Sequence, residues 1–276
     1  MAYLKTANHR IHYKTFGHKR QPALLILHGF LGSWRDFSPV LPALKANFYC
    51  ILPDLPGHGQ TTTFNGSYSF DKTARSLLSL LDYLQIYQAN LLGYSMGGRI
   101  ALYVACKHST RIHRTILESA SPGLKTAAER KARRASDDAI ALQLETLPFQ
   151  DFLSKWSANP LFESLKQYPD AYTDMIKRRL QNNPIELANA LRGLSLGNQP
   201  SMWRSLRRDR FSLMLMFGTQ DYKFSILSQE MSKECELNNK SDAVLKPFLD
   251  MGHNIHLEAE QISSKAYVQA ITGFLL

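Results

Sequence analysis

The chain has 276 residues, 44% of them hydrophobic, which suits one large domain or one domain with an insertion and argues against a wholly disordered protein. Its formal net charge of +10 favours an anionic partner, yet the sequence carries no nucleic-acid motif and no apolar run long enough to cross a membrane. We therefore expect a small anionic substrate and no nucleic-acid or membrane partner, with a merely solvated basic surface as the alternative.

Short apolar runs alternate with helical segments through the first 121 residues. Strands are predicted at residues 11–15, 23–27, 50–53, 88–92 and 114–118. A helix is predicted from Ser69 to about residue 86, because its leucines recur on one side, and another at residues 99–105. This alternation predicts an α/β fold with a mostly parallel, twisted sheet and helices on both faces.

The alternation stops between residues 122 and 210, where almost no strand-like segment occurs. Helices are predicted there at residues 127–147, 149–157, 170–181 and 184–194. Strands resume at residues 211–217 and 243–248, with a helix at 224–236 between them and one closing helix that runs to about residue 276. The sequence therefore predicts a core of residues 1–121 and 211–276 and an inserted helical cap at 122–210.

The amino terminus and the cysteines bear on the location of the protein. Residues 1–5 do not begin the long apolar run of a signal peptide. Cys50, Cys106 and Cys235 are scattered without the spacing of a metal site, as expected for free thiols in a reducing compartment. We expect a cytoplasmic protein that binds no metal and is a monomer or a weak homo-oligomer.

The stretch from Gly93 to Gly97, read Gly-Tyr-Ser-Met-Gly, joins a predicted strand to a predicted helix. A strand, a tight Gly-x-Ser-x-Gly turn and a helix are the context of a nucleophile elbow. Glycine suits the two outer positions because side chains there would collide with neighbouring backbone. Ser95 would then lie at the apex, beside helix amides that favour negative charge. The alternative is a glycine-bearing turn with a surface serine.

Two further residues complete a candidate triad. Asp221 follows the predicted strand at 211–217, and His253 lies in the loop after the strand at 243–248. The order Ser95, Asp221, His253 is the order found in α/β-hydrolases. In this arrangement His253 accepts the serine proton, and Asp221 orients the imidazole and stabilises its charged form. Asp250 is the competing acid and His256 the competing base, and we rank them behind Asp221 and His253.

Loops after the second and third predicted strands carry further polar residues. The segment His28-Gly29-Phe30 follows the strand at 23–27, and such a loop supplies the second oxyanion donor in α/β-hydrolases. We expect the backbone amides of Phe30 and Met96 to form the oxyanion hole. The side chains of His28, Asp54 and His58 are expected to shape the loops and not to act in catalysis.

Arginines near the elbow suggest the kind of substrate. Arg99 lies four residues after Ser95, so both can face one cavity. Arg130, Arg133 and Arg134 have helical spacing in the predicted cap. Guanidinium groups bind carboxylates through two parallel hydrogen bonds, so a triad beneath an arginine-bearing lid favours a small polycarboxylate. The alternatives are salt bridges within the protein and a solvated helix face.

The chain resembles, nearly end to end, the 2-succinyl-6-hydroxy-2,4-cyclohexadiene-1-carboxylate synthases of menaquinone biosynthesis, a group within the α/β-hydrolase superfamily. The resemblance is carried by residues 93–99, 118–124, 129–130, 136–137, 156, 159–162, 179–183, 221–224 and 252–256. By position, the family's substrate-contacting residues fall on Tyr94, Arg99, Arg133, Trp156 and Arg179. Ser157 departs from the pattern, because some members have a tyrosine there, so one hydrogen bond to the substrate is in doubt.

This resemblance implies a lyase that needs no cofactor. The substrate would be 2-succinyl-5-enolpyruvyl-6-hydroxy-3-cyclohexene-1-carboxylate, a tricarboxylate from which the enzyme eliminates pyruvate. Ser95, activated by His253 and Asp221, would act as the base, and the oxyanion hole would stabilise an enolate. Two alternatives stay open at this point: a serine hydrolase of an anionic ester, thioester or C–C bond, and a non-catalytic receptor that keeps a hydrolase pocket.

Overall fold

Strands and helices alternate along most of the chain. A computed structural model describes residues 2–66, 68–209, 212–237, 242–262 and 264–276. Within these ranges, nine strands form one sheet in the order β1-β2-β4-β3-β6-β7-β8-β9, with β5 paired to β2. Their bounds are β1 (Ala2–Lys5), β2 (His9–Phe16), β3 (Ala23–Leu27), β4 (Tyr49–Pro53), β5 (Thr62–Thr63), β6 (Ala89–Tyr94), β7 (Ile112–Glu118), β8 (Ser212–Gly218) and β9 (Asp242–Phe248).

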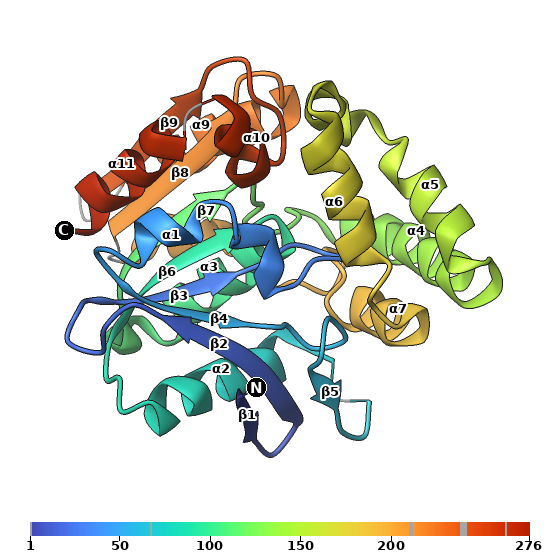
Figure 1. Ribbon diagram of the computed structural model, residues 1–276, viewed down its shortest axis with the longest axis horizontal. Helices are drawn as coiled ribbons and strands as arrows, with labels where there is room; N and C mark the ends of the chain where they lie inside the picture. Colours follow the sequence, from blue (N-terminus) through green and yellow to red (C-terminus); the bar gives the residue numbers. More distant parts are fainter. Residues whose placement is uncertain (1, 67, 210–211, 238–241, 263) are drawn as a thin grey trace.

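The sheet is mostly parallel. Strand β2 runs antiparallel to β1, β4 and β5, whereas the pairs from β4 through β3, β6, β7 and β8 to β9 are parallel. Figure 1 shows β1 and β9 at opposite edges of the sheet. The carboxyl ends of the parallel strands therefore meet at one end of the sheet, where α/β proteins place their functional groups.

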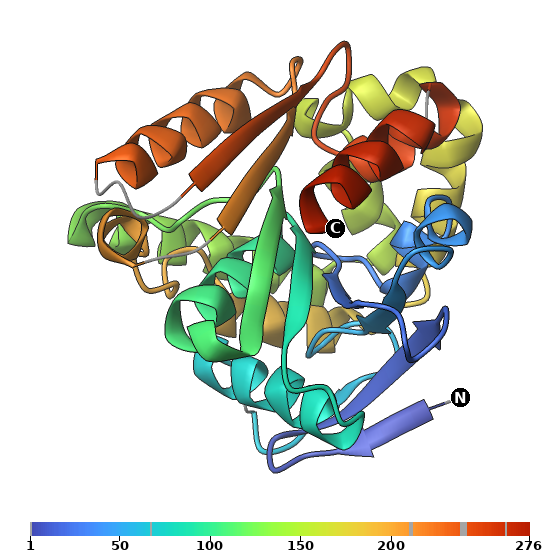
Figure 2. The same ribbon diagram turned by 90° about the vertical axis from the view of Figure 1, so that its left-hand side faces the viewer.

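Helices cover both faces of this sheet (Figure 1, Figure 2). Outside the region of the predicted cap, their bounds are η1 (Trp34–Phe37), α1 (Leu41–Leu44), α2 (Phe70–Tyr83), α3 (Met96–Lys107), η2 (Ser109–Arg111), α9 (Tyr222–Glu236), α10 (Ile255–Ile262) and α11 (Ser264–Leu275). Successive side chains of a strand point to opposite faces. Accordingly, Leu25 and Leu27 of β3 pack with α2, α3 and α9, while Leu24 and Ile26 pack with α1 and α11.

Between residues 122 and 209, all of which the structure describes, there are helices and no strand. The bounds are α4 (Ala127–Thr146), α5 (Phe149–Ser157), η3 (Pro160–Phe162), η4 (Ser164–Gln167), α6 (Pro169–Arg179), α7 (Pro184–Gly193) and α8 (Trp203–Arg208). Helices α4 to α7 gather on one side of the sheet (Figure 1). An apolar cluster that includes Ala141, Phe152 and Leu187 packs α4, α5 and α7 together, and Leu31 joins it from the core.

The chain enters and leaves this helical segment at neighbouring points. The amide of Met202 donates a hydrogen bond to the carbonyl of Pro122 at 2.7 Å. The side-chain amide of Gln199 donates to the carbonyl of Ser121 at 3.0 Å. Gly123 adopts a φ of 99°, which favours glycine and turns the chain toward α4. The two connections therefore cross side by side.

The predicted α/β-hydrolase fold is confirmed, but the single closing helix was wrong, and the short elements β1, β5, α1 and α8 were not predicted. The single closing helix is two helices, because α10 carries Leu257 against the cap while α11 buries Tyr267 and Ile271 beside the sheet. Strand β1 was not predicted, since its half-buried side chains form no apolar run. The predicted boundary at residues 210 and 211 lies outside the described residues. In the ranges given above, no helix combines the length and apolar character needed to cross a bilayer.

Candidate active site

The turn between β6 and α3 holds Ser95 in an unusual backbone conformation. Its φ is 50° and its ψ is −109°, a region that non-glycine residues rarely adopt and that functional sites often contain. A Cβ on Gly97 would lie 2.3 Å from the carbonyl oxygen of Leu27, and one on Gly93 would lie 2.6 Å from that of Gly97. Both positions therefore require glycine, and the turn presents the Ser95 side chain at its apex.

Three residues from three different loops meet at this apex. The Nε2 atom of His253 lies 3.2 Å from Ser95 Oγ, and its Nδ1–H donates to Asp221 Oδ2 at 2.6 Å. The side chains of His253 and Asp221 are buried. Asp221 also caps α9 by accepting a bond from the amide of Phe224 at 3.4 Å, which fixes its position after β8. The arrangement can move a proton from the serine to the imidazole.

The competing acid and base lie elsewhere. Asp250 is exposed and its backbone, with a φ of 58°, forms the turn after β9. His256 is fully buried, and its Nδ1–H donates to Glu118 Oε1 at 2.7 Å. The hydroxyl of Tyr267 donates to the other oxygen of Glu118 at 2.7 Å. His256 is thus part of a buried polar cluster behind the elbow, not the partner of the serine.

The loop after β3 passes directly against the elbow. A Cβ on Gly29 would lie 2.6 Å from the ring of Tyr94 and 3.6 Å from Ser95 Cβ, so the backbone runs close to the serine. The amides of Phe30 and Met96 donate no hydrogen bond to any part of the chain that the structure describes. Unengaged amides beside a serine are suitable donors for a developing oxyanion.

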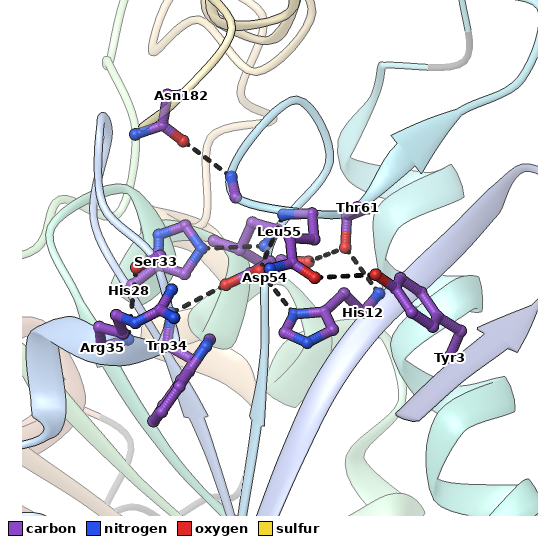
Figure 3. A network of polar contacts seen from close by, with 12 residues as sticks. Tyr3, His12, His28, Ser33, Trp34, Arg35, Asp54, Leu55, Thr61 and Asn182 are labelled. Atoms are coloured by element: carbon purple, nitrogen blue, oxygen red, sulfur yellow. Dashed lines mark hydrogen bonds and ion pairs between the residues drawn. The ribbon is translucent and has the colours of Figure 1, made fainter. Parts of the chain in front are cut away.

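A buried carboxylate shapes the neighbouring loops (Figure 3). Asp54 accepts hydrogen bonds from His12 Nδ1 at 2.8 Å and from the amides of Trp34 and Gln60 at 2.9 and 3.0 Å. Burial by itself would raise the pKa of Asp54, but the bond from His12, the nearby His28 and the two amides hold that pKa below its ordinary value. Asp54 is therefore a charged anchor for two loops.

The rings of two histidines beside Asp54 are hydrogen-bonded to backbone groups of the loops. The Nδ1–H of His28 donates to the carbonyl of Gly29 at 2.8 Å, and its Nε2 accepts from the amide of Leu55 at 2.9 Å (Figure 3). The Nδ1–H of His58 donates to the carbonyl of Pro56 at 3.0 Å. Burial and the proximity of His28 lower the pKa of His58 to about 3, so its ring is neutral at physiological pH.

Arg99 of α3 and Arg133 of α4 approach one another from the core and the cap. Arg99 donates from Nη1 to the carbonyl of Leu194 at 2.9 Å, and its pKa is lowered to about 9 by burial and by Arg133. Arg133 donates from Nε to Asp137 Oδ1 at 2.8 Å, and Asp137 accepts a second bond from Ser195 at 2.6 Å. Two guanidinium groups so placed disfavour each other and favour an anion between them.

The other two arginines of α4 do not join this pair. Arg130 donates from Nη1 to the carbonyl of Leu124 at 3.1 Å, and Arg134 donates from Nη1 to the carbonyl of Gly197 at 2.8 Å. Of the three arginines with helical spacing, only Arg133 therefore faces Arg99. Helical spacing alone could not reveal that two of them hold the ends of the cap in place.

Arg179, at the end of α6, is buried, yet its Nε and Nη1 atoms have no hydrogen-bond partner in the described chain. Its guanidinium lies 4.8 Å from the centre of the Phe162 ring, and burial lowers its pKa. The indole Nε1 of Trp156 is also buried and has no partner among the residues that the structure describes. Tyr94 packs between His253 and His256, with ring centres 5.3 and 4.5 Å away. Unpaired donors on Arg179 and Trp156 are suited to a polar ligand.

The buried hydroxyl of Ser157, where some relatives have tyrosine, has no partner in the described residues either. Sequence reasoning missed Asp137, Ser195 and Asn182. Asp137 could have been found from its spacing of four residues after Arg133, whereas nothing local identifies Ser195. Asn182 donates to the carbonyl of Leu31 at 2.9 Å and accepts from the amide of Gly59 at 2.7 Å, so it ties the cap to two core loops (Figure 3).

A mostly parallel sheet, a serine at a strand-to-helix elbow, and an aspartate and a histidine after later strands define an enzyme of the α/β-hydrolase fold. A family model described as alpha/beta hydrolase fold matches residues 22–260. The "Putative 2-succinyl-6-hydroxy-2,4-cyclohexadiene-1-carboxylate synthase" of Bacillus subtilis is 33% identical over 263 residues, which is 93% of either chain. This chain belongs to that synthase family within the α/β-hydrolases.

Further comparisons agree with this membership. The solved "Structure of MenH from S. aureus" is 32% identical, has a TM-score of 0.86 and matches 96% of this chain and 97% of that one. "Protein PHYLLO, chloroplastic" of Arabidopsis thaliana is 32% identical over 246 residues, but this chain spans only 14% of its length. The enol-lactonase from Burkholderia xenovorans LB400, 18% identical with a TM-score of 0.79, shares the fold.

Proposed function

We propose that this enzyme eliminates pyruvate from 2-succinyl-5-enolpyruvyl-6-hydroxy-3-cyclohexene-1-carboxylate and yields 2-succinyl-6-hydroxy-2,4-cyclohexadiene-1-carboxylate. The observation that carries the proposal is the buried Arg179, whose Nε and Nη1 have no partner in the described chain. A buried cation with free donors is costly unless a ligand supplies the acceptors. A carboxylate does so. The names of the relatives describe a product with two carboxylates, and the proposed substrate carries a third on its enolpyruvyl group.

The arginines would divide these carboxylates among themselves. Arg99 and Arg133 form one anion site between α3 and α4, because Arg133 is the charged group that most lowers the pKa of Arg99 after burial. Arg179 forms a second site beneath the cap, with Tyr94 close to its guanidinium. In this proposal Trp156 contributes its indole N–H, and residues 122–210 act as a lid over the bound substrate.

The chemistry would start at Ser95. His253 accepts the serine proton across the 3.2 Å contact, and Asp221 stabilises the imidazolium. The serine oxygen then takes a proton from the ring carbon beside the succinyl ketone. The C–H electrons form an enolate, which the amides of Phe30 and Met96 stabilise. When the enolate collapses, the ring double bonds shift to the 2,4-diene and the C–O bond breaks. The departing enolate of pyruvate takes the proton held by the His253 imidazolium, which yields pyruvate and restores the triad. Proton transfer and anion binding need only these side chains and amides.

A pyruvate-release assay on this substrate tests the proposal. Pyruvate and the conjugated cyclohexadiene chromophore should appear at equal rates without a burst, since no bond forms between enzyme and substrate. Quenched enzyme should carry no substrate-derived mass on Ser95. An adduct on Ser95 that forms and decays at the turnover rate would contradict elimination and support a serine hydrolase. Binding without turnover of any anionic substrate would support a receptor.

A further inference from the structure

A buried glutamate joins the cap to the loop that carries His253. Glu258 lies in the first turn of α10 and its side chain is fully buried. Its Oε2 accepts a hydrogen bond from the amide of Gly252 at 2.8 Å, and its Oε1 accepts one from the hydroxyl of Ser164 at 2.9 Å. Gly252 directly precedes His253, whereas Ser164 begins η4 in the cap. One carboxylate therefore bridges the two parts of the molecule.

The contact between the cap and this loop leaves no free space. A Cβ on Gly252 would lie 1.9 Å from Ser164 Oγ and 2.9 Å from Ser164 Cβ. Only glycine fits opposite the serine, so the two backbones approach closely. A shift of η4 must therefore change either the position of Gly252 or its hydrogen bond to Glu258.

Apolar packing extends this contact to the anion site. Leu165 of η4, Met175 of α6 and Leu257 of α10 form a separate buried cluster. Helix α6 ends at Arg179, and Leu257 is the neighbour of Glu258 in the chain (Figure 1). Closely packed side chains transmit displacement because the interior has little room to absorb it. A movement of Arg179 is thus carried to η4 and α10.

Because Glu258 is a buried carboxylate, its position depends on the hydrogen bonds that it accepts from Gly252 and Ser164. Burial raises the pKa of Glu258, while the bonds from Gly252 and Ser164 act in the opposite direction and the nearby Glu118 raises it further. A buried carboxylate that loses a donor cannot recover the lost free energy from water. Removal of the Ser164 hydroxyl should therefore displace Glu258 toward other donors and disturb its bond to Gly252.

We propose that Glu258 is a positioning residue that transmits the placement of the cap, through Ser164, to the backbone that orients His253. The inference rests on the proposed function in one respect: the ligand that seats the cap is the carboxylate bound by Arg179. When that carboxylate draws α6 and η4 into place, Glu258 holds the Gly252 amide and the imidazole faces Ser95. Without it, the imidazole is less often aligned.

Steady-state kinetics with Ser164→Ala provide the first test. We expect kcat to fall about tenfold, the scale of one hydrogen bond to a charged group, with KM changed by less than about twofold because Arg179 is intact. Glu258→Gln should lower kcat similarly, and the double variant should be no worse than the poorer single one. Ser232→Ala is the matched control, because it removes a buried hydroxyl that donates to Glu236 at 3.3 Å within α9.

A substrate-free measurement separates this inference from the proposed reaction. The proton between His253 Nδ1 and Asp221 lies in a 2.6 Å hydrogen bond and should give a downfield proton resonance in the intact enzyme. Ser164→Ala should shift and broaden that resonance, and Ser232→Ala should leave it unchanged. An unaltered resonance together with wild-type kcat in Ser164→Ala would overturn the inference. An altered resonance in a protein that releases no pyruvate would support the bridge and contradict only the reaction.

Discussion

Two buried polar groups, the carboxylate of Asp54 and the guanidinium of Arg179, differ in how completely they are hydrogen-bonded. Beneath the core loops, both oxygens of Asp54 accept bonds, from Trp34 on one side and from His12 and Gln60 on the other (Figure 3). Beneath the cap, Arg179 is as deeply buried, but two of its nitrogens have no partner among the described residues. Both carboxylate oxygens of Asp54 are thus satisfied, although Nε2 of His12 has no partner in the described chain, whereas the buried cation Arg179 keeps two unsatisfied donors there.

We interpret the difference as one between a structural group and the proposed ligand site. Buried polar groups in folded proteins are nearly always hydrogen-bonded, since an unmet donor costs about 1–3 kcal/mol. The fold meets this requirement at Asp54 and leaves it unmet at Arg179 and at the indole of Trp156. Side chains of the first kind should matter for stability, and those of the second kind for activity.

The largest effect is expected at the serine itself. Ser95→Ala should lower kcat by at least about a thousandfold, the scale of losing a triad member. The melting temperature should not fall, because the substitution leaves both buried groups intact. Asp221→Asn and His253→Ala should also be severe, but the three losses should not add. Near-wild-type turnover by a folded Ser95→Ala protein would show that another group is the base.

Asp54→Ala should strongly destabilise the folded protein. It leaves the His12 ring and two backbone amides without their acceptor. Each unmet buried donor costs about 1–3 kcal/mol, so the free energy of unfolding should fall by about 3 kcal/mol or more. Chemical denaturation measures the loss. Asp71→Ala, which removes an exposed carboxylate 3.0 Å from Arg75, is the control and should change the free energy of unfolding by less than about 1 kcal/mol. If Asp54→Ala lowered the free energy of unfolding no more than Asp71→Ala does, the structural role of Asp54 would be contradicted.

Arg179→Met should have the opposite effect, with stability retained and activity lost. It removes a buried cation whose donors are unmet, so the melting temperature should stay the same or rise. The value of kcat/KM should fall about a hundredfold, since a charge-assisted pair of hydrogen bonds to the substrate is lost. Its neighbour Arg178 pairs with Asp36 at 3.4 Å, and Arg178→Met should cost more stability and less activity. A reversal of this order would contradict the assignment.

The smallest expected effect is the stabilisation of the folded protein by an unreactive anion that binds at Arg99. Burial and Arg133 lower the pKa of Arg99 to about 9, so the folded state disfavours its charged form. The stability contributed by this group is present above its unfolded pKa and is lost as pH falls through about 9. At pH 7, succinate at ten times its Kd should therefore restore about 1.4 kcal/mol and raise the melting temperature by a few degrees.

Thermal melts across pH measure this effect. The succinate response should shrink as pH rises through about 9, where the guanidinium loses its charge. Arg99→Met should lack most of the response, whereas Arg75→Met, which removes an exposed cation on α2, should keep it. A response of the same size in Arg99→Met would place the anion somewhere else.

The parts of this molecule that sequence could predict are those governed by local rules. The strand at residues 23–27 was predicted with the bounds of β3, because a strand buried on both faces is a continuous apolar run. The elbow could be predicted because one tight turn leaves no room for side chains at Gly93 and Gly97. Asp221 and His253 were found from their places after strands, and the structure brings both to Ser95. Their catalytic role stays a prediction.

Contacts between distant segments had no such signal. The bond from Ser195 to Asp137 joins residues 58 positions apart, and nothing in the sequence around Ser195 indicates this partner. From the sequence, His256 was a candidate for the catalytic base. Only the fold shows that its ring is hydrogen-bonded to Glu118 of β7. The unpaired donors of Arg179 depend on what surrounds α6 from three directions. Sequence could therefore name the candidate catalytic residues but not the side chains that hold them in place.

The paired connections at the base of the cap also bear on how such enzymes diversify. Pro122 and Met202 are one hydrogen bond of 2.7 Å apart, so nearly 80 residues leave and rejoin the sheet at almost the same point. An insertion with adjacent ends can be lengthened, shortened or exchanged with little strain on its host. The elbow, Asp221 and His253 lie outside it, whereas Arg133 and Arg179 lie within it. If the proposed roles hold, natural selection can change the substrate by exchanging this segment, while the proposed proton-transfer residues are inherited unchanged.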